Sequence, residues 1–309
     1  MSCNHPIGAW IMKKQKTSNG KNVICFSNPN TNYSESHAEG VMLPCGQCIG
    51  CRLERSRQWA IRCLHEAQMH DNNSFITLTY KDEYLPHNGT LVKKHFQNFM
   101  KRLRKNIYPK KVRFFHCGEY GNNLQRPHYH ACLFGYDFPD KTIWSVRDKI
   151  NLYRSQQLEN LWKYGFSTVG EVTFESAAYV ARYITKKING KQQKAHYKKL
   201  IPEYITMSRR PGIASTFYTK YGKELYNHDE LIIRKDIKVK PVKYYDKLYD
   251  LTNPSEMATI KQKRKEVLKN NSDVFNRSRM QVEKQIKEKS NELLKRGYEN
   301  ANNENLLNV

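Results

Sequence analysis

A chain of 309 residues can bury one good-sized core with additions at both ends, and a hydrophobic content of 39% suits a globular fold. Its 53 Lys and Arg against 29 Asp and Glu give a formal charge of +24, which, with 20 Tyr available for stacking, favours a nucleic-acid partner. No apolar run has the length of a membrane span and the first residues lack a signal-peptide core, so we expect a cytoplasmic protein with no membrane partner. In that compartment eight Cys indicate thiols or metal ligands and argue against a disulfide framework.

The first part of the chain combines an irregular segment with a cysteine-rich turn. Residues 1–44 are rich in Asn, Ser and Gly, which predicts an extended or looped chain. The sequence PCGQCIGC follows and continues directly into a helix, which we expect over residues 52–70. These features define a first, cysteine-rich region over residues 1–56.

A strand and a basic helix come next. The β-branched and aromatic run SFITLTY predicts a strand at 74–80, and apolar residues at helical spacing predict a helix at about 91–105. A basic helix face is usually only solvated, but the net charge makes contact with phosphates an equal alternative here. The candidate DNA-binding residues, on this helix and in a later basic stretch, are Lys93, Lys94, Lys101, Arg102, Arg104, Arg209 and Arg210.

The remaining pattern indicates an α+β fold, with an antiparallel or mixed sheet and helices packed on it. We expect two strands joined by a hairpin, at 112–118 and 128–135, and then a helix at 155–163. One or two further strands are expected at 166–174, and another helix at 176–188. The core is therefore expected at 57–190, with a basic and aromatic extension packed on it at 191–254. The composition of the tail at 255–309 predicts a charged helix that becomes disordered.

His128 and His130 open the second strand of the expected hairpin. Because side chains alternate along a strand, both imidazoles face the same way and can bind one ion. Glu119 is the first candidate for a third ligand, because the hairpin brings it beside His128, and His116 is the second. The plain alternative for an isolated pair of this kind is two surface histidines at a strand end.

Tyr179 and Tyr183 lie one turn apart on the last predicted helix. Aromatic pairs at this spacing usually belong to the core, but this helix has a complete aliphatic stripe without them. A phenol can attack a phosphodiester when a metal polarises the phosphate and a cation favours the phenolate. Lys186 or Lys187 could be that cation.

Three motifs in order carry a resemblance: FITLTY, then GEYG with RPHYHACLFG, then YVARYITKK. They resemble the motifs of HUH endonucleases, and more narrowly the replication initiators of gokushovirus-type microviruses, which are small single-stranded-DNA bacteriophages. PCGQCIGCRLERSRQWA and TMSRRPGI extend the similarity, which covers roughly residues 1–250.

This resemblance implies an HUH-like antiparallel sheet flanked by helices, with His128 and His130 as ligands of Mg²⁺ or Mn²⁺. Tyr179 and Tyr183 would be two nucleophiles, one for cutting and one for transfer. Such enzymes nick the viral origin, keep the 5′ end as a phosphotyrosine while the 3′-hydroxyl primes rolling-circle synthesis, and then rejoin the strand. The implied setting is the cytoplasm of a bacterial host, with the viral DNA origin and the host helicase and DNA polymerase as partners.

The motif C-x-x-C-x-x-C places Cys45, Cys48 and Cys51 at the spacing of metal ligands. Three thiolates are one short of a closed zinc site, so a further ligand is needed, from Cys3, His5 or Cys25. We favour a structural Zn²⁺ over free thiols. An iron–sulfur cluster is a third and weaker alternative, because nothing else in the sequence indicates redox chemistry.

Three other functions compete with this interpretation. A non-catalytic zinc-knuckle protein that binds nucleic acid would explain the charge but not the ordered motifs. Histidine-triad hydrolases need a third alternating histidine, where this chain has Cys132. A membrane-surface protein needs an accessible basic amphipathic helix, whereas the one at 91–105 lies between two strands and is expected to pack on the sheet.

Overall fold

The computed structural model describes residues 3–18, 20, 22–27, 38–121, 124–147, 150–186, 193–234, 237–269 and 278–290. The chain forms two compact units, one of Met1–Glu54 with Leu268–Leu294 and one of Arg55–Val267 with Lys295–Val309. The limit at Glu54 lies close to the one expected at residue 56, whereas the limits expected at 190 and 254 have no counterpart in this division and stay predictions. Within the described ranges, no helix combines the length and the apolar character that crossing a membrane requires.

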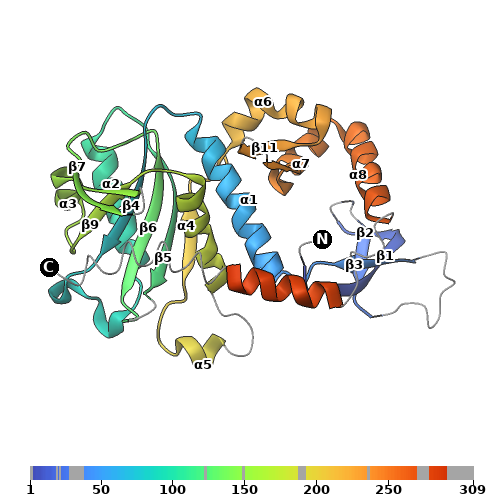
Figure 1. Ribbon diagram of the computed structural model, residues 1–309, viewed down its shortest axis with the longest axis horizontal. Helices are drawn as coiled ribbons and strands as arrows, with labels where there is room; N and C mark the ends of the chain where they lie inside the picture. The colour runs from blue at the N-terminus through green and yellow to red at the C-terminus, as the bar shows by residue number, and fades with distance from the viewer. Residues whose placement is uncertain are drawn as a thin grey trace. The chain divides into compact units, whose positions relative to one another are not determined.

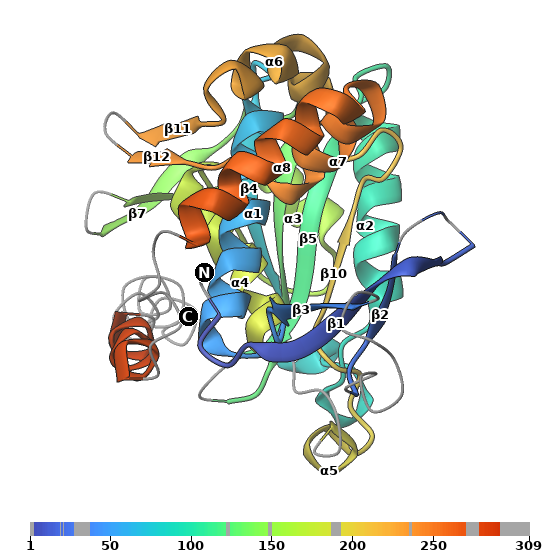
Figure 2. The ribbon, with the colours of Figure 1, turned by 90° about the vertical axis from the view of Figure 1, so that its right-hand side faces the viewer.

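A seven-stranded sheet in the order β10-β5-β6-β4-β9-β8-β7 forms the centre of the second unit (Figure 1). All its paired strands are antiparallel, and Figure 2 shows the edge strand β10 alongside β5. The expected α+β architecture, an antiparallel sheet flanked by helices, is therefore confirmed. The strands are β4 (Asn73–Thr79), β5 (Arg113–Tyr120), β6 (Pro127–Phe134), β7 (Thr142–Arg147), β8 (Ile150–Arg154), β9 (Ser167–Gly170) and β10 (Tyr204–Met207).

Helices cover both faces of this sheet (Figure 1). On one face, α2 (Lys93–Asn106) buries Phe96, Phe99, Met100 and Leu103, the four residues at helical spacing in the sequence, in a cluster that also includes residues of α3 (Gln156–Leu161). On the other face, α1 (Ile49–Ala67) and α4 (Phe174–Lys186) pack against β5 and β6. The start of α4 is fixed by Thr173 and Ser176, whose hydroxyls each accept a hydrogen bond from the backbone N–H of the other residue.

A further layer of the second unit packs against α1 through Ile61. It consists of α6 (Ser215–His228), β11 (Leu231–Arg234), β12 (Ile237–Val239), α7 (Lys243–Thr252) and α8 (Pro254–Lys269). A short helix, α5 (Gln193–Tyr197), precedes β10, and two 3-10 turns, Asp82–Tyr84 and His87–Gly89, follow β4. The described residues of the region at 191–254, which has no clear periodicity in sequence, thus supply β10 of the central sheet, the pair β11 and β12, and the helices α5, α6 and α7.

The beginning of the expected tail, in α8, is part of this packed layer. Met257 is only 1% exposed, and Arg264 forms ion pairs with Asp229 and Asp246. The spacing of Met257, Ile260 and Arg264 puts them on one face of α8. This face packs on α6 and α7, so the helix is held in place although most of its other residues are charged or polar. Residues 278–290 form another helix, and the other parts of the tail, 270–277 and 291–309, lie outside the described residues.

The first unit contains a three-stranded antiparallel sheet in the order β2-β1-β3. The described part of residues 1–44 is therefore extended, as one of the two expected alternatives had it, but it forms regular strands where irregular chain was expected. Its strands are β1 (Ile7–Lys16), β2 (Asn22–Cys25) and β3 (Ala38–Leu43). The turn between β1 and β2 contains Gly20 with a φ of 73°, a backbone conformation that glycine adopts without strain. An Asn-Gly pair between two strands is a hairpin signal when apolar and polar residues alternate on both sides of it. The end of β1 is rich in Lys, so this alternation cannot be seen in the sequence.

Candidate functional site

Strand register brings the predicted acid beside the predicted histidines. Glu119 in β5 lies directly opposite His128 in β6, and His130 follows on the same face two residues later. This face is the one that α1 and α4 cover, because Phe115 and Cys117 of β5 and Cys132 of β6 belong to the cluster packed against those helices.

Three side chains converge at this point. The Glu119 Oε1 atom lies 2.7 Å from Nε2 of His128 and 3.0 Å from Nε2 of His130. The three potential ligand atoms all lie within 4.8 Å of one another. Glu119 and His130 are each 1% exposed, whereas the His128 side chain is 13% exposed, so the cluster is open to solvent on the His128 side.

The far ring nitrogens of both histidines are held by other groups. Nδ1 of His128 lies 3.1 Å from the Arg126 carbonyl oxygen, and Nδ1 of His130 lies 2.9 Å from Oγ1 of Thr77. A carbonyl only accepts, so Nδ1 of His128 carries a proton, and Nε2, which lies beside Glu119, is the nitrogen that would give up its proton to bind an ion. Orienting contacts of this kind accompany metal-binding histidines. Thr77 could not be found from the sequence, because its position opposite His130 depends on the register between β4 and β6.

The electrostatics keep Glu119 ionised. Burial alone would raise its pKa, but the charge of His128 and hydrogen bonds from both histidines lower the pKa of Glu119 to about 2. A carboxylate with two imidazole nitrogens in a converging set suits a divalent cation, and the mixed oxygen and nitrogen donors fit Mn²⁺ as well as Mg²⁺.

His116, the second candidate for the third ligand, lies on the opposite face of the sheet. Its ring stacks on Phe96 of α2 with a centroid separation of 3.4 Å, and its Nδ1 atom lies 2.8 Å from Oγ1 of Thr206. Burial, and to a smaller extent the charge of His130, lower the pKa of His116 well below its usual value. The structure therefore leaves Glu119 as the acid beside the two histidines.

Tyr179 lies against this cluster. Its ring is perpendicular to that of His130, with the centroids 5.1 Å apart, and the Arg182 guanidinium carbon lies 5.9 Å from the Tyr179 ring centroid. Tyr179 is only 5% exposed and belongs to the core cluster of this face, so it contributes to packing as well. Arg182, one turn along α4, was not identified from the sequence, although its i, i+3 spacing from Tyr179 is the signal that could have found it.

Part of the predicted site lies outside the described residues. Tyr183 and Lys186 belong to α4 by their backbone, but their side chains are not described, and Lys187 is not described at all.

The chain is similar to known phage proteins. Residues 73–188 match the model of a family described as replication-associated protein ORF2. The replication-associated protein ORF2 of Spiroplasma virus 4 is 32% identical over 284 residues, which cover 87% of each chain. The replication-associated protein VP4 of Bdellovibrio phage phiMH2K is 32% identical over 72% of this chain and 74% of its own. The protein ORF4 of Chlamydia phage 1, also named replication-associated, is 36% identical over 47% of this chain and 38% of its own.

The chain belongs to this family of phage replication-associated proteins. The resemblance to gokushovirus-type replication proteins is thereby confirmed. No solved structure matches this replication-associated protein. The matched region, 73–188, begins with β4 and contains Glu119, both histidines and both tyrosines.

The basic residues of α2 lie away from the cluster. Since α2 covers the opposite face of the sheet, its basic residues are not beside His128. Lys93, Lys94 and Lys101 are exposed, whereas Arg102 and Arg104 donate hydrogen bonds to backbone carbonyls of Leu161 and Val112.

Arg209 and Arg210 are exposed at the opposite end of the sheet from the cluster. They follow β10, where Met207 lies opposite Phe115, whereas Glu119 is near the other end of β5, so they are roughly 15–20 Å away along the strand. The Arg126 guanidinium is closer to the cluster, and it bonds to Asp82 and to the Tyr80 carbonyl.

The four predicted cysteines, Cys3, Cys45, Cys48 and Cys51, form a second cluster, in the first unit. Of the three candidates for the fourth ligand, Cys3 joins the C-x-x-C-x-x-C motif, whereas His5 and Cys25 are not part of the group.

Proposed function

We propose that this protein initiates rolling-circle replication of a single-stranded-DNA phage by nicking one strand of the viral origin with a tyrosine. One observation carries the proposal: in a phage replication-associated protein, a Glu-His-His cluster that can hold a divalent cation lies against the ring of Tyr179. The cluster and the tyrosine come from β5, β6 and α4, which pack together in one core, and this suits a reaction that depends on positioning.

Glu119, His128 and His130 would hold the cation. Mg²⁺ or Mn²⁺ held there would supply a Lewis acid that polarises the scissile phosphate and offsets the charge that develops on its oxygens. The partial exposure of His128 leaves a side on which a phosphate can approach, while the buried Glu119 and His130 keep the donor set fixed.

The tyrosine would form the covalent link. Its phenol oxygen attacks phosphorus and the P–O3′ bond breaks, which gives a 5′-phosphotyrosine and a free 3′-hydroxyl. The proton lost by the phenol is balanced by the one that the 3′-oxygen takes up, so no further reactant is needed and the link can be reversed to rejoin the strand. Tyr179 and Tyr183 would alternate as nucleophiles, and Lys186 or Lys187 would favour the phenolate.

Binding of the origin would come mainly from charge. A formal charge of +24 attracts the phosphate backbone at any sequence, and the aromatic residues offer stacking surfaces for the unpaired strand. Elongation from the 3′-hydroxyl then requires a helicase and a DNA polymerase, which we propose come from the host.

The test is the formation of a covalent protein–DNA adduct on a labelled single-stranded origin oligonucleotide that survives denaturation. We expect an adduct with Mn²⁺ or Mg²⁺ and none with a chelator. His128→Ala and His130→Ala should reduce adduct formation ~10³-fold or more, because several kcal/mol of charge stabilisation are lost, while DNA binding persists. His87→Ala, an exposed histidine in a turn after β4, is the matched control and should behave as the unchanged protein. Binding without an adduct under every metal condition would instead favour a non-catalytic nucleic-acid-binding protein.

A further inference from the structure

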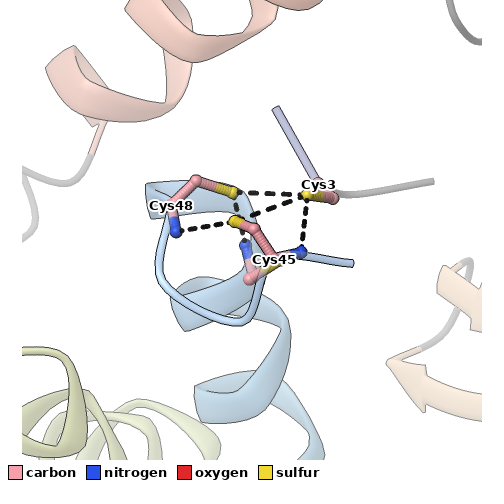
Figure 3. A group of neighbouring side chains, drawn as sticks. Cys3, Cys45 and Cys48 are labelled. Atoms are coloured by element: carbon pink, nitrogen blue, oxygen red, sulfur yellow. Dashed lines mark hydrogen bonds between the residues drawn. The ribbon is translucent and has the colours of Figure 1, made fainter. Parts of the chain in front are cut away.

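The four cysteines of the first unit have the geometry of a closed metal site. The Sγ atom of Cys3 lies 3.7 Å from that of Cys45 and 3.8 Å from that of Cys48, and Figure 3 shows these three side chains pointing toward one another. A tetrahedral ZnS₄ centre with Zn–S bonds of about 2.3 Å has S···S edges of about 3.8 Å. With Cys51, all four sulfurs lie within 4.8 Å of one another. A disulfide has an S–S bond of about 2.05 Å, far shorter than these separations.

Backbone N–H groups point at the sulfurs. The N–H of Asn4 donates to Cys48 at 3.2 Å, that of Cys45 to Cys3 at 3.3 Å, and that of Cys48 to Cys45 at 3.3 Å. Such donors stabilise thiolates, the form in which cysteine binds a metal. The turn that allows this contains Gly46, whose φ of 74° is a conformation that other residues rarely adopt.

The first unit also needs a source of stability beyond its apolar core. Among its described residues, Ala9 and Met12 are the buried apolar side chains besides Cys3 and Cys51. A three-stranded sheet with so small a core is marginal by itself, and small domains of this kind are commonly held by a metal. A metal joining Cys3 to the motif at 45–51 would close the chain around β1, β2 and β3.

We propose that Cys3, Cys45, Cys48 and Cys51 bind one structural Zn²⁺, which holds the first unit folded. Four thiolates complete the coordination of zinc and leave no open position, so the ion has no part in the nicking reaction. A mononuclear iron is the alternative that the same four sulfurs could accept, and metal analysis distinguishes the two.

The test uses the full chain with Cys25→Ser as the matched control. Cys25 lies in β2 of the same unit and outside the cluster. We expect about one zinc per chain in the unchanged protein and in Cys25→Ser, and little or none in Cys3→Ser and Cys48→Ser. Cobalt reconstitution should give the intense thiolate charge-transfer and visible bands of a tetrahedral sulfur site. Cys48→His, which keeps a ligand, should still bind cobalt with a shifted spectrum, even if the serine variants fold poorly.

A second readout separates a metal from packing alone. Chelation should accelerate amide hydrogen exchange in β1 and β3 by tenfold or more and leave exchange in β5 and β6 unchanged, because the metal stabilises the first unit only. Iron in place of zinc, a cobalt spectrum that survives Cys3→Ser unaltered, or exchange in β1 that is insensitive to chelation would each overturn the proposal.

Discussion

The orientation of His130 depends on one hydroxyl. Thr77 contacts its Nδ1 atom on the side away from Glu119, so losing the hydroxyl frees the ring to turn. We predict that Thr77→Ala raises the Mn²⁺ concentration needed for half-maximal adduct formation roughly 10–100-fold. Thr206→Ala is the control, because Thr206 contacts His116 in the same way on the other face of the sheet. It should cost a similar ~1 kcal/mol of folding stability and leave the metal requirement unchanged. Equal metal requirements in the two variants would remove the orienting role of Thr77.

A buried histidine far from the cluster makes folding pH-dependent. His65 stacks on Phe217, lies 2.8 Å from the Tyr245 hydroxyl through Nδ1, and has its pKa lowered to about 4 by burial. Between pH 6.5 and 4 the unfolded chain therefore binds the proton that the folded chain rejects, so stability falls as the pH falls through this window. We predict that the urea concentration at the midpoint of unfolding decreases as the pH is lowered through this window. The decrease per pH unit should be smaller in His65→Phe than in the unchanged protein, because Phe keeps the ring stack but cannot titrate. An identical slope in both proteins would mean that His65 does not carry this effect.

Strand alternation alone shows that only one of the two candidates for the third ligand, Glu119 and His116, can lie on the same face as His128. Glu119 and His116 are three residues apart in β5, an odd number, so they face opposite sides of the sheet. Cross-strand register decides which of them faces the same side as His128, and the turn at 121–126 leaves that register undetermined in sequence. The position of Tyr179 against His130 depends on how α4 packs on the sheet, which spacing along one helix cannot give.

At the scale of elements, α2 and the Glu-His-His cluster lie on opposite faces of the sheet, so the DNA contacts proposed for α2 can be tested apart from the proposed cutting. The helix covers the face of the sheet opposite the cluster, so its lysines can hold DNA only at a distance from the cut. We predict that replacing Lys93, Lys94 and Lys101 together by Ala flattens the salt dependence of single-strand binding by about 2 in log–log slope, since each lost contact removes about 0.7. At saturating DNA the single-turnover cleavage rate should stay within twofold of normal. A tenfold slower rate at saturation would place α2 at the reacting strand.

The anchoring of α8 makes a further prediction about the second unit. Met257 is buried among residues of α6 and α7, so Met257→Ala should lower the free energy of unfolding by ~2–5 kcal/mol. Val267, 62% exposed on the same helix, is the control, and its replacement by Ala should change stability by less than ~0.5 kcal/mol. Chemical denaturation of both variants decides the point, and equal stabilities would mean that α8 is as solvated as its composition suggests.

The sequence predicted the long and strongly periodic elements of the core and, among the short ones, α3 and β9. β4, β5, β6, α1, α2 and α4 lie within a few residues of their expected positions, because burial on one or both faces imposes a clear pattern. The prediction missed β1, β2, β3, β7, β8 and β10, which are short or carry polar residues on solvent-facing positions, so their composition resembles that of a loop. It also gave no elements for 191–254, where α6 and α7 form without a clear apolar period in the sequence. The packing of α8 was missed for a related reason. Met257, Ile260 and Arg264 anchor this helix, but they are few, and the charged residues around them give it the composition of a solvated helix.

At the scale of the whole molecule, the two clusters lie in separate compact units. The family match at 73–188 falls within the second unit, which holds the Glu-His-His cluster and Tyr179, and the four cysteines lie in the first unit. This division assigns the proposed cutting to one unit and the proposed zinc to the other, so we expect loss of the proposed zinc and loss of the proposed catalytic cation to have separable effects.

The most direct measurement is mass-spectrometric mapping of the residue that carries the DNA. The adduct formed with an origin oligonucleotide is trapped, digested and sequenced for the unchanged protein, Tyr179→Phe, Tyr183→Phe and the double variant. The account predicts a nucleotide-bearing Tyr179 or Tyr183 in the unchanged protein, the remaining tyrosine in each single variant, and no adduct in a folded double variant. DNA on any other residue, or an adduct formed by the double variant, would contradict it.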